Sequence, residues 1–226
     1  IFGGILARRD NEGDQKQMTD ISQVRADADV YILSVKDDAL PVLIPQLCRG
    51  REDKLFLHTA GSVSIDVFQG MARHYGVFYP MQTFSRQKRV SFEEIPCFIE
   101  GSGEEETAAI EALASQLSHR VYRLSSEARK YLHLSAVFAC NFVNHCYAIS
   151  AELLEKHGIP FDVMLPLIDE TAAKVHQMSP KDAQTGPAVR YDENVIRAQS
   201  QLLKNNPLVK DIYDRMSMNI HRLSEE

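Results

Sequence analysis

Val30-Tyr31-Ile32-Leu33-Ser34-Val35 is a short, almost continuously apolar stretch that ends abruptly at the charged residues Lys36-Asp37-Asp38. Strands of a parallel sheet are buried on both faces and carry such runs, so this stretch is a candidate central strand. Either aspartate can cap a following helix, and Pro41 is tolerated in the first turn of that helix. The stretch therefore predicts a β-strand followed by an α-helix.

The same strand-then-helix pattern recurs through the first half of the chain. Residues 55–59 form a second apolar run, which turns at Ala60-Gly61-Ser62 toward another helix. Three more strands are expected at 76–79, 97–100 and 120–124, with a helix at 107–117 between the last two. Alternating strands and helices indicate β/α units around a mostly parallel sheet.

Beyond Ser125 every element that we expect is a helix. Residues 127–157 are predicted to form one long helix, which ends at Gly158 and is followed by Pro160. Because this helix is apolar nearly all round, other segments should cover it on most sides. Further helices are expected from Asp162 to about residue 178, from Asp192 to about residue 205 and over 208–223. We therefore divide the chain into two domains, residues 1–124 and residues 125–226.

The composition places the chain among ordinary globular proteins. It has 226 residues, of which 44% are hydrophobic and 25% charged, and its formal net charge is −6 at pH 7. An acidic chain is a poor match for the phosphate backbone of nucleic acids, so we expect no nucleic-acid partner. Polar side chains interrupt the long apolar stretch at residues 132–151, which argues against a membrane span.

Four cysteines bear on the cellular compartment. Cys48, Cys97, Cys140 and Cys146 show no Cys-x-x-Cys spacing. The last two lie in the long apolar helix, where a free thiol packs as a small hydrophobe. We therefore expect reduced cysteines and a cytoplasmic location.

Candidate cofactor residues follow the predicted strands of the first domain, counting the strand-like segment 1–7 among them. In an open α/β sheet the ligand crevice lies outside the carboxyl ends of the strands. The residues at these ends are Arg8, Arg9, Ser34, Val35, Lys36, Asp37, His58, Thr59, Ala60 and Gly61. An arginine after the second strand of a dinucleotide-binding unit is the usual partner of a ribose 2′-phosphate, which favours NADP over NAD. A solvated strand end is the alternative for Arg8 and Arg9.

The glycine-rich phosphate loop of such a fold is not found in the sequence. Gly3-Gly4 has neither the spacing nor the position after a strand that a Gly-x-Gly-x-x-Gly loop requires. The chain opens in the strand-like segment 1–7 without an initiator methionine. We therefore expect the first strand, the phosphate loop and its helix to precede Ile1.

Polar side chains gather on one broad face of the long apolar helix. At about 100° per residue, His133 and Asn141 lie about 80° apart around the helix, and Asn141 and His145 about 40° apart. Together with Asn144 they need hydrogen-bond partners, because an unsatisfied buried polar group costs about 1–3 kcal/mol. A ligand pocket would supply partners for the whole set. Ordinary hydrogen bonds between helices are the alternative for any single residue.

The segment 185–192, Thr-Gly-Pro-Ala-Val-Arg-Tyr-Asp, predicts a stiff loop next to a helix. Gly186 permits close backbone approach, and Pro187 restricts the chain. Arg190 stands just before Asp192, the expected cap of the next helix, and can brace the loop through a carboxylate or bind an anionic substrate. Bracing is the interpretation that we favour.

Four motifs in sequence order resemble a known family. They are His-Thr-Ala-Gly-Ser at 58–62, Tyr-Pro-Met-Gln-Thr-Phe at 79–84, Tyr-Leu-His at 131–133 with Asn141, and the segment 185–192. Together they resemble Rossmann-like NADP oxidoreductases of unassigned substrate, which are related in plan to deazaflavin-dependent NADP oxidoreductases, pyrroline-carboxylate reductases and 6-phosphogluconate dehydrogenase. The resemblance extends over almost all of residues 20–222.

The resemblance implies a fold and an assembly. It implies a Rossmann-like α/β domain that binds the nucleotide, followed by an all-α domain like the C-terminal domain of 6-phosphogluconate dehydrogenase, which often builds a homodimer. Two residues depart from the related patterns. Tyr79 stands where the family commonly has histidine, and Val137 stands where the related dehydrogenases have a lysine four residues before an asparagine. Tyr79 can still donate a hydrogen bond to a substrate oxygen, and Gln82 can orient it.

These observations predict an NADP-dependent oxidoreductase. It would transfer a hydride between the nicotinamide and a small carbonyl, imine or alcohol bound between the domains. Histidine suits proton transfer because its unperturbed pKa is about 6.5. No metal is expected, since His133 and His145 lie too far apart around the helix and no carboxylates join them. The predicted catalytic residues are His133, Asn141, Tyr79 and Gln82, and the predicted substrate-binding residues are Asn144, His145, Thr185 and Arg190.

Two other classes of protein are alternatives. A nucleotide-binding scaffold or sensor would keep the fold without turnover, and the missing lysine favours it. A purely structural dimerisation protein explains less, because it has no need for histidine, glutamine and arginine at strand ends and beside a Gly-Pro loop.

Overall fold

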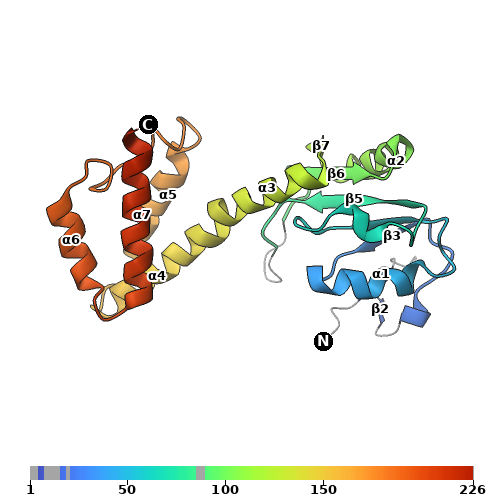
Figure 1. The fold of residues 1–226 in the computed structure, drawn as a ribbon, viewed down its shortest axis with the longest axis horizontal. Helices are drawn as coiled ribbons and strands as arrows, with labels where there is room; N and C mark the ends of the chain where they lie inside the picture. Colours follow the sequence, from blue (N-terminus) through green and yellow to red (C-terminus); the bar gives the residue numbers. More distant parts are fainter. Residues whose placement is uncertain (1–4, 8–15, 19–20, 85–89, 226) are drawn as a thin grey trace. The chain divides into compact units, whose positions relative to one another are not determined.

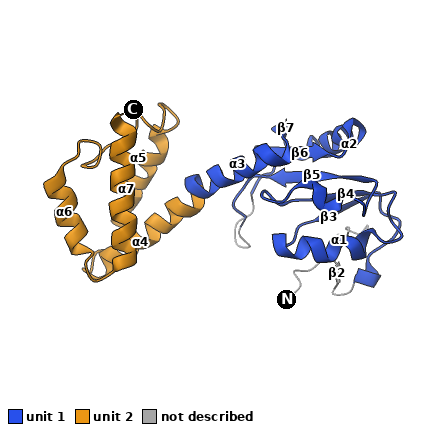
Figure 2. Ribbon diagram, in the orientation of Figure 1, with its two compact units in different colours: residues 1–139 blue, residues 140–226 orange. Residues whose placement is uncertain are grey.

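The computed structural model describes residues 5–7, 16–18, 21–84 and 90–225. The chain divides into two compact units, residues 1–139 and residues 140–226, which Figure 2 shows in different colours. The first unit holds the sheet, and the second is built from helices (Figure 1). The domain boundary predicted near Ser125 stays a prediction.

A five-stranded sheet forms the centre of the first unit. Its strands, in spatial order, are β3 (Val30–Leu33), β4 (Leu55–His58), β5 (His74–Pro80), β6 (Cys97–Gly101) and β7 (Val121–Arg123). β3, β4 and β5 run parallel, β6 runs antiparallel to β5, and β7 runs parallel to β6. The prediction of a mostly parallel sheet is confirmed. The prediction that residues 30–35 form a buried central strand is wrong for the described sheet, because β3 lies at its edge and exposes Val30 and Ile32.

The direction of β6 is a feature that the pattern of strands and helices does not predict. A parallel neighbour needs a crossover connection of about a dozen residues or more, usually a helix, whereas an antiparallel neighbour can return directly. The described residues between Pro80 and Cys97 contain no helix. The chain therefore turns back beside β5, and Pro80 pairs with Cys97 in the register.

A separate pair of short strands lies near the beginning of the chain. β1 (Ile5–Ala7) pairs antiparallel with β2 (Lys16–Met18), and the two form their own two-stranded sheet. The expectation that the segment 1–7 supplies a strand of the main sheet is wrong, because β1 finds its backbone partners in β2. Arg8 and Arg9, the predicted contacts of a 2′-phosphate, lie outside the described residues.

Helices pack on both faces of the main sheet. α1 (Leu40–Cys48) buries four aliphatic side chains in a cluster with Phe56. α2 (Glu104–Ala114) buries Ile110 in a second cluster with Leu57. Successive residues of a strand point to opposite faces, so the neighbours Phe56 and Leu57 belong to different clusters. Figure 1 shows α1 and α2 on opposite sides of the sheet.

The connections after β3 and β4 are short turns. Pro41 lies in the first turn of α1, as predicted. Neither Asp37 nor Asp38 caps this helix, because η2 (Asp37–Ala39) forms a 3₁₀ turn of its own before the helix begins. The helix predicted after β4 is reduced to one 3₁₀ turn, η3 (Ile65–Phe68).

The long helix predicted over 127–157 is present in three consecutive pieces. α3 (Ser126–Ala136) and α4 (Val143–Glu155) are α-helical, and a π-helical segment, η4 (Val137–Phe142), lies between them in the sequence. A π turn is wider than an α turn, so the assumed rotation of about 100° per residue does not hold across it. Gly158, with a φ of +69°, follows the helix in the predicted left-handed conformation.

Large apolar side chains of this helical region are exposed in the single chain. The exposed fraction is 68% for Tyr131, 51% for Leu134 and 61% for Phe138. The expectation that other segments cover the helix on most sides is therefore wrong for the chain by itself. Apolar side chains exposed at helical spacing are typical of a protein interface.

The second unit contains only helices and their connections among its described residues, as predicted. Besides α4 it contains η5 (Phe161–Met164), α5 (Leu165–Lys174), α6 (Glu193–Leu202) and α7 (Pro207–Glu225). Asp192 caps α6 by accepting a hydrogen bond from the Val195 amide at 3.3 Å, as predicted. Asp162 caps no helix, since it lies inside η5. None of the described helices has both the length and the apolar character that a membrane span requires.

Candidate functional site

The carboxyl ends of β3, β4 and β5 meet at one edge of the sheet. Leu33 pairs with His58, and His58 pairs with Val77 in the next strand. Because the three strands are parallel, the residues at and beyond their ends, among them Ser34 and Tyr79, lie along this edge. The predicted cofactor residues after β3 and β4 therefore share the edge with the predicted catalytic Tyr79.

The loops that follow β3 and β4 are bonded to each other. The Thr59 amide donates a hydrogen bond to the Leu33 carbonyl at 3.2 Å. The Ser62 hydroxyl donates to the Asp37 carboxylate, so Asp37 is engaged by the protein itself. Ser34 and Lys36 are exposed beside them. These two side chains offer a hydroxyl and a cation to a ribose or phosphate group.

His58 supports the second of these loops from beneath. Its ring is fully buried, stacks on Phe68 with the ring centroids 5.8 Å apart, and accepts a hydrogen bond at Nδ1 from the Ala60 amide, 3.2 Å away. Since Nδ1 is the acceptor, the proton of the neutral ring is assigned to Nε2. Burial, and secondarily the positive charge of Arg129, lower the pKa of His58 to about 4. The ring is therefore neutral at physiological pH, and it contributes to the site by supporting the loop.

Tyr79 and His133 form a polar pair at the same edge. The Tyr79 hydroxyl lies 3.1 Å from His133 Nδ1, and the two rings meet edge to face with centroids 6.1 Å apart. Burial raises the pKa of Tyr79, an effect that the charge of Arg129 opposes and that of Asp37 reinforces. The phenol therefore stays protonated at neutral pH and can donate its hydrogen to Nδ1 of a neutral imidazole.

Gly61 lies directly against this pair. A Cβ atom at residue 61 would come within 2.6 Å of His133 Nδ1 and 3.0 Å of Tyr79 Cζ, so a side chain there would collide with both rings. Glycine allows the backbone to approach this closely. Three predicted site residues that are far apart in the sequence therefore form one compact group within the first unit.

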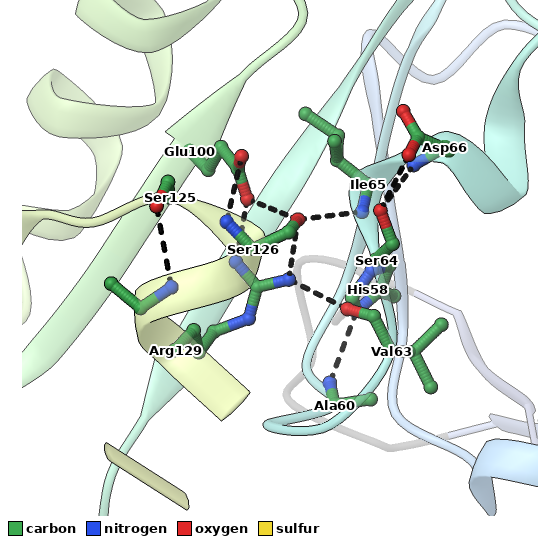
Figure 3. Close-up of polar contacts among 11 residues, drawn as sticks. His58, Ala60, Val63, Ser64, Ile65, Asp66, Glu100, Ser125, Ser126 and Arg129 are labelled. Atoms are coloured by element: carbon green, nitrogen blue, oxygen red, sulfur yellow. Dashed lines mark hydrogen bonds and ion pairs between the residues drawn. The ribbon is translucent and has the colours of Figure 1, made fainter. Parts of the chain in front are cut away.

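A buried arginine that the sequence analysis does not identify lies next to this group. Arg129 is 1% exposed, and its Nη1 lies 2.6 Å from the carboxylate of Glu100 (Figure 3). Its Nη2 donates to the Val63 carbonyl and to the Ser126 hydroxyl. The signal in the sequence is its spacing, because residues four apart share one face of a helix and Arg129 precedes His133 by four.

Gln82 is exposed and bonded to its own neighbour. Its side-chain oxygen accepts hydrogens from the amide and the hydroxyl of Thr83, at 2.8 Å and 3.3 Å. Within the described structure it makes no hydrogen bond with Tyr79. The expectation that Gln82 orients Tyr79 is therefore wrong, and the hydrogen-bond partner of the phenol is His133.

Three of the predicted site residues from the long helix belong to the second unit. Asn141, Asn144 and His145 are exposed, and Asn141 lies in the π-helical segment η4. His133 belongs to the first unit. A site shared by His133 and Asn141 therefore stays a prediction.

The segment 185–192 forms a loop held by its own backbone, by one aromatic contact and by the Ser224 hydroxyl, which donates to the Val189 carbonyl at 3.3 Å. The Asp192 amide donates to the Pro187 carbonyl at 2.9 Å. Tyr191 has a φ of +50°, and its ring stacks on His221 with centroids 4.2 Å apart. A positive φ is uncommon for a bulky residue and stores strain that the surroundings must offset.

Thr185 and Arg190 are both exposed on this loop. Arg190 and Asp192 form no ion pair, and the Asp192 carboxylate instead accepts from the Val195 amide. Arg190 therefore does not brace the loop through this carboxylate, and the backbone, the Tyr191 ring and the Ser224 hydroxyl hold the loop instead. The predicted contact of Thr185 and Arg190 with a substrate stays a prediction.

Within the described ranges, no group of three or more histidine, cysteine, aspartate or glutamate side chains could hold a metal ion. The four cysteines are free thiols. Burial raises the pKa of Cys48 to about 11, and it also raises the pKa of Cys97. These two thiols stay protonated and are poor nucleophiles. The Tyr79 phenol and the His133 imidazole are therefore the candidate groups for proton transfer at this edge of the sheet.

A largely parallel sheet with a polar pair at its carboxyl edge, followed by a helical unit, defines a Rossmann-like protein of two units. Residues 95–220 match a family described as a domain of unknown function, DUF2520. The chain belongs to this family. No functionally curated protein matches the chain at a significant level.

Solved structures share this plan. A provisionally assigned NADP oxidoreductase from Bacteroides fragilis is 55% identical to this chain, and the match covers 91% of this chain and 80% of that one with a TM-score of 0.86. A protein from Thermotoga maritima is 20% identical and covers 88% and 80% of the two chains, with a TM-score of 0.73. An imine reductase from Myxococcus stipitatus, solved with NADP⁺, is 14% identical and covers 92% and 78%, with a TM-score of 0.62.

The three similarities carry different weight. The identity with the Bacteroides fragilis protein shows a common family, and it confirms the resemblance inferred from the four motifs. The two more distant structures show the fold alone. The predicted fold class, a Rossmann-like α/β domain followed by a helical domain, is confirmed.

Proposed function

We propose that the protein is an NADP-dependent oxidoreductase that transfers a hydride between the nicotinamide ring and a small carbonyl, imine or alcohol. The observation that carries this proposal is the Tyr79–His133 pair against Gly61, at the carboxyl edge of three parallel strands. Membership in one family with the Bacteroides fragilis protein supports NADP as the cofactor. The fold shared with an imine reductase and a pyrroline carboxylate reductase, both bound to NADP, agrees with it.

The side chains at this edge fit part of such a cofactor. Ser34 and Lys36 are exposed where a ribose or phosphate group would lie. The Ser62 hydroxyl donates to the Asp37 carboxylate, which can otherwise accept a hydrogen bond from a ribose hydroxyl. When bound, the cofactor would supply or accept the hydride, and the protein would position the substrate and handle the proton.

Tyr79 and His133 can move that proton. A neutral His133 accepts the Tyr79 hydrogen at Nδ1. A protonated His133 donates from Nδ1 to the phenol oxygen instead, which leaves the Tyr79 hydrogen available to the oxygen or nitrogen of the substrate. The pair can thus give one proton to a carbonyl or imine that is being reduced. In the reverse direction it takes one proton from an alcohol that is being oxidised.

The rest of the substrate site is proposed from the second unit. Asn141, Asn144 and His145 would supply hydrogen bonds, and Thr185 and Arg190 would meet polar or anionic groups of the substrate. All five side chains are exposed, as this proposal requires.

A homodimer in the cytoplasm is part of the proposal. The exposed row of Tyr131, Leu134 and Phe138 is apolar surface that a second copy of the chain would bury. Free thiols agree with a reducing compartment. Sedimentation velocity measures the oligomeric state, and a monomer at micromolar concentration would contradict the dimer.

A nucleotide-binding scaffold without turnover is the second candidate. Val137 favours it, because related dehydrogenases carry a lysine at this position four residues before an asparagine. Binding of NADPH without turnover on a wide panel of substrates would support the scaffold against the enzyme.

The test begins with titration of the full-length protein with NADPH and NADH, followed by a screen of carbonyl and imine substrates for cofactor oxidation. Binding of neither cofactor would contradict both candidates. If turnover is found, Tyr79→Phe and His133→Ala should each lower kcat by about a hundred-fold, the usual contribution of a general acid, with little change in NADPH affinity. Tyr75→Phe is the matched control, because Tyr75 lies on the same strand and packs its ring on Phe68. Unchanged kcat in Tyr79→Phe and His133→Ala would remove the pair from the mechanism.

A further inference from the structure

We infer that Arg129 is a positioning residue for the Tyr79–His133 pair, because its buried guanidinium fastens the first turns of α3 to the loop that carries Gly61. The inference deepens the proposed function, on which its consequence for turnover rests. Its structural part concerns only the first unit and requires no cofactor.

The guanidinium of Arg129 bonds two other segments and the first residue of its own helix. Nη1 donates to Glu100 Oε2 at 2.6 Å, which joins the helix to strand β6. Nη2 donates to the Val63 carbonyl at 2.6 Å and to Ser126 Oγ at 3.1 Å, as Figure 3 shows. With an exposed fraction of 1%, the side chain is shielded from water, which would otherwise compete for these bonds.

Ser126 adds a second link between the same segments. Its amide donates to Glu100 Oε1 at 2.9 Å, and its hydroxyl donates to Glu100 Oε2 at 2.6 Å. The same hydroxyl oxygen accepts the Ile65 amide hydrogen at 2.9 Å. The loop after β4 is therefore bonded to α3 at two points, the Val63 carbonyl and the Ile65 amide, while Glu100 bonds α3 to the sheet.

This double attachment lies one helical turn from the polar pair. Arg129 and His133 are four residues apart in α3 and so project from the same face. Arg129 bonds Val63, and His133 meets Gly61, two residues earlier in the same loop. A Cβ at residue 61 would lie 2.6 Å from His133 Nδ1, so the helix and the loop have almost no clearance here. Because Tyr79 lies on strand β5, a shift of α3 by about 1 Å relative to the sheet would break the 3.1 Å bond between Tyr79 and His133.

A buried arginine is better suited to fixing the position of α3 than to raising the free energy of unfolding. A buried ion pair gains little net stability, because the cost of removing two charges from water offsets their attraction. A guanidinium, however, holds its donors in a rigid planar fork, so several bonds at fixed angles set the position of the helix against the loop. A lysine at the same place would keep the charge and lose the fork. This difference separates positioning from simple charge neutralisation.

The test compares Arg129→Lys with Arg123→Lys in the full-length protein. Arg123 is the matched control, because it pairs with two carboxylates, Glu104 and Glu111, on the surface of the same unit. Protein labelled with ¹⁵N in its histidines reports the state of the His133 ring by NMR, and the spectrum of His133→Gln identifies its resonance. Tyr79→Phe gives the resonance expected when the bond to the phenol is lost.

We expect the His133 resonance of Arg129→Lys to move to its position in Tyr79→Phe, and that of Arg123→Lys to stay at the wild-type position. With a substrate from the screen, Arg129→Lys should lower kcat by about ten-fold or more, because catalytic groups displaced by about 1 Å lose their alignment. KM and the NADPH dissociation constant should change less than kcat. A folded Arg129→Lys protein with the wild-type resonance and kcat would overturn the inference.

Ser126→Ala decides the question if Arg129→Lys does not fold. This variant removes the acceptor of the Ile65 amide and leaves the bond between Arg129 and Glu100 in place. We expect hydrogen exchange of the Ile65 amide to become about ten-fold faster, together with a partial shift of the His133 resonance. A wild-type resonance despite faster exchange would reject the positioning role. The NMR result needs no turnover, so a failure to find any substrate would contradict the proposed function and leave this inference to stand on the resonance alone.

Discussion

Two loops of this protein carry predicted site residues, and they are held in different ways. The loop 59–65 of the first unit is held by Arg129 and Ser126, two side chains from a distant part of the chain that bond its backbone, and His58, directly before the loop, lies beneath it. The loop 185–192 of the second unit is held by its own backbone, by the stacking of Tyr191 on His221 and by an exposed hydrogen bond from the Ser224 hydroxyl to the Val189 carbonyl at 3.3 Å. The comparison separates two kinds of contribution to a site.

The first kind is fixed geometry. Around Gly61 the polar groups are half-buried and closely packed, and the bond between Tyr79 and His133 has a defined length. The second kind is exposure to solvent. Thr185 and Arg190 are exposed, so their side chains are open to a ligand. A proton donor needs the first kind, whereas recognition of a polar group at a site opening can use the second. Substitutions in matched pairs, each with a control residue in the second unit, test this division.

The largest difference is expected between Arg129→Met and Arg190→Met. Arg129→Met leaves Glu100 without its buried partner, which should lower the free energy of unfolding by about 3–5 kcal/mol. Arg190 is exposed and makes no ion pair with Asp192, so Arg190→Met should change it by less than about 0.5 kcal/mol. Urea unfolding followed by circular dichroism gives both values. Equal losses in the two variants would end the distinction between the loops.

The next largest effect is a change in the free energy of unfolding with pH, which we expect from the titration of His58. The folded pKa of about 4 lies below the unfolded value of about 6.5, so between these values the unfolded chain alone takes up a proton. The stability that the buried neutral ring provides is therefore complete above about pH 6.5 and is lost as the pH falls toward 4, by about 3 kcal/mol in all.

His58→Asn removes this titration and keeps an acceptor near the Ala60 amide. The gap in unfolding free energy between wild type and His58→Asn should therefore narrow as the pH is lowered from about 7 to about 4.5. The same substitution at the exposed His157 serves as the control. Parallel stability curves for wild type and His58→Asn over this range would contradict the assignment.

The smallest expected difference in unfolding free energy is between substitutions of two glycines, Gly61 and Gly186. Gly61→Ala places a Cβ against both rings of the polar pair, and such overpacking costs about 1–3 kcal/mol. Gly186→Ala meets no atom within 4 Å, and its cost of about 1–2 kcal/mol comes from a φ of +110° that an L-residue adopts only under strain. The two stabilities are similar, so the His133 NMR resonance decides. It should move in Gly61→Ala and stay in Gly186→Ala, and a shift in both would show that the loops are coupled.

Much of the fold was open to prediction because its signals are local. The apolar runs at 30–35 and 55–59 mark strands, because apolar runs of this length bounded by polar residues are typical of strands. Only the second run is buried along most of its length, since β3 alternates exposed and buried residues at the edge of the described sheet. Gly158 and Asp192 were interpreted correctly for the same reason, because a left-handed residue after a helix and a cap before one depend on a few neighbouring residues.

The errors have a common cause in contacts between residues far apart in the sequence. The direction of β6 depends on what connects it to β5, and the partner of β1 is β2 rather than the main sheet. A histidine at a strand end suggests a ligand contact, yet His58 is buried because Phe68 and the loop after β4 enclose it. The π-helical segment at 137–142 is invisible to a calculation that assumes uniform α-helical rotation.

The candidate site shows the same limit. Tyr79, Gly61 and His133 could each be named from their motifs, because residue type and position at a strand end or on a helix suffice for that. That these three residues contact one another could not be predicted from the sequence. The contact between Tyr79 and His133 joins residues 54 positions apart, and the buried pair of Glu100 and Arg129 joins residues 29 positions apart. Amino-acid order alone therefore indicated the family, most of the strands and helices and the chemical types at the edge. Which of those groups touch was decided by tertiary packing, because a hydrogen bond depends on a few tenths of an ångström that no local pattern encodes.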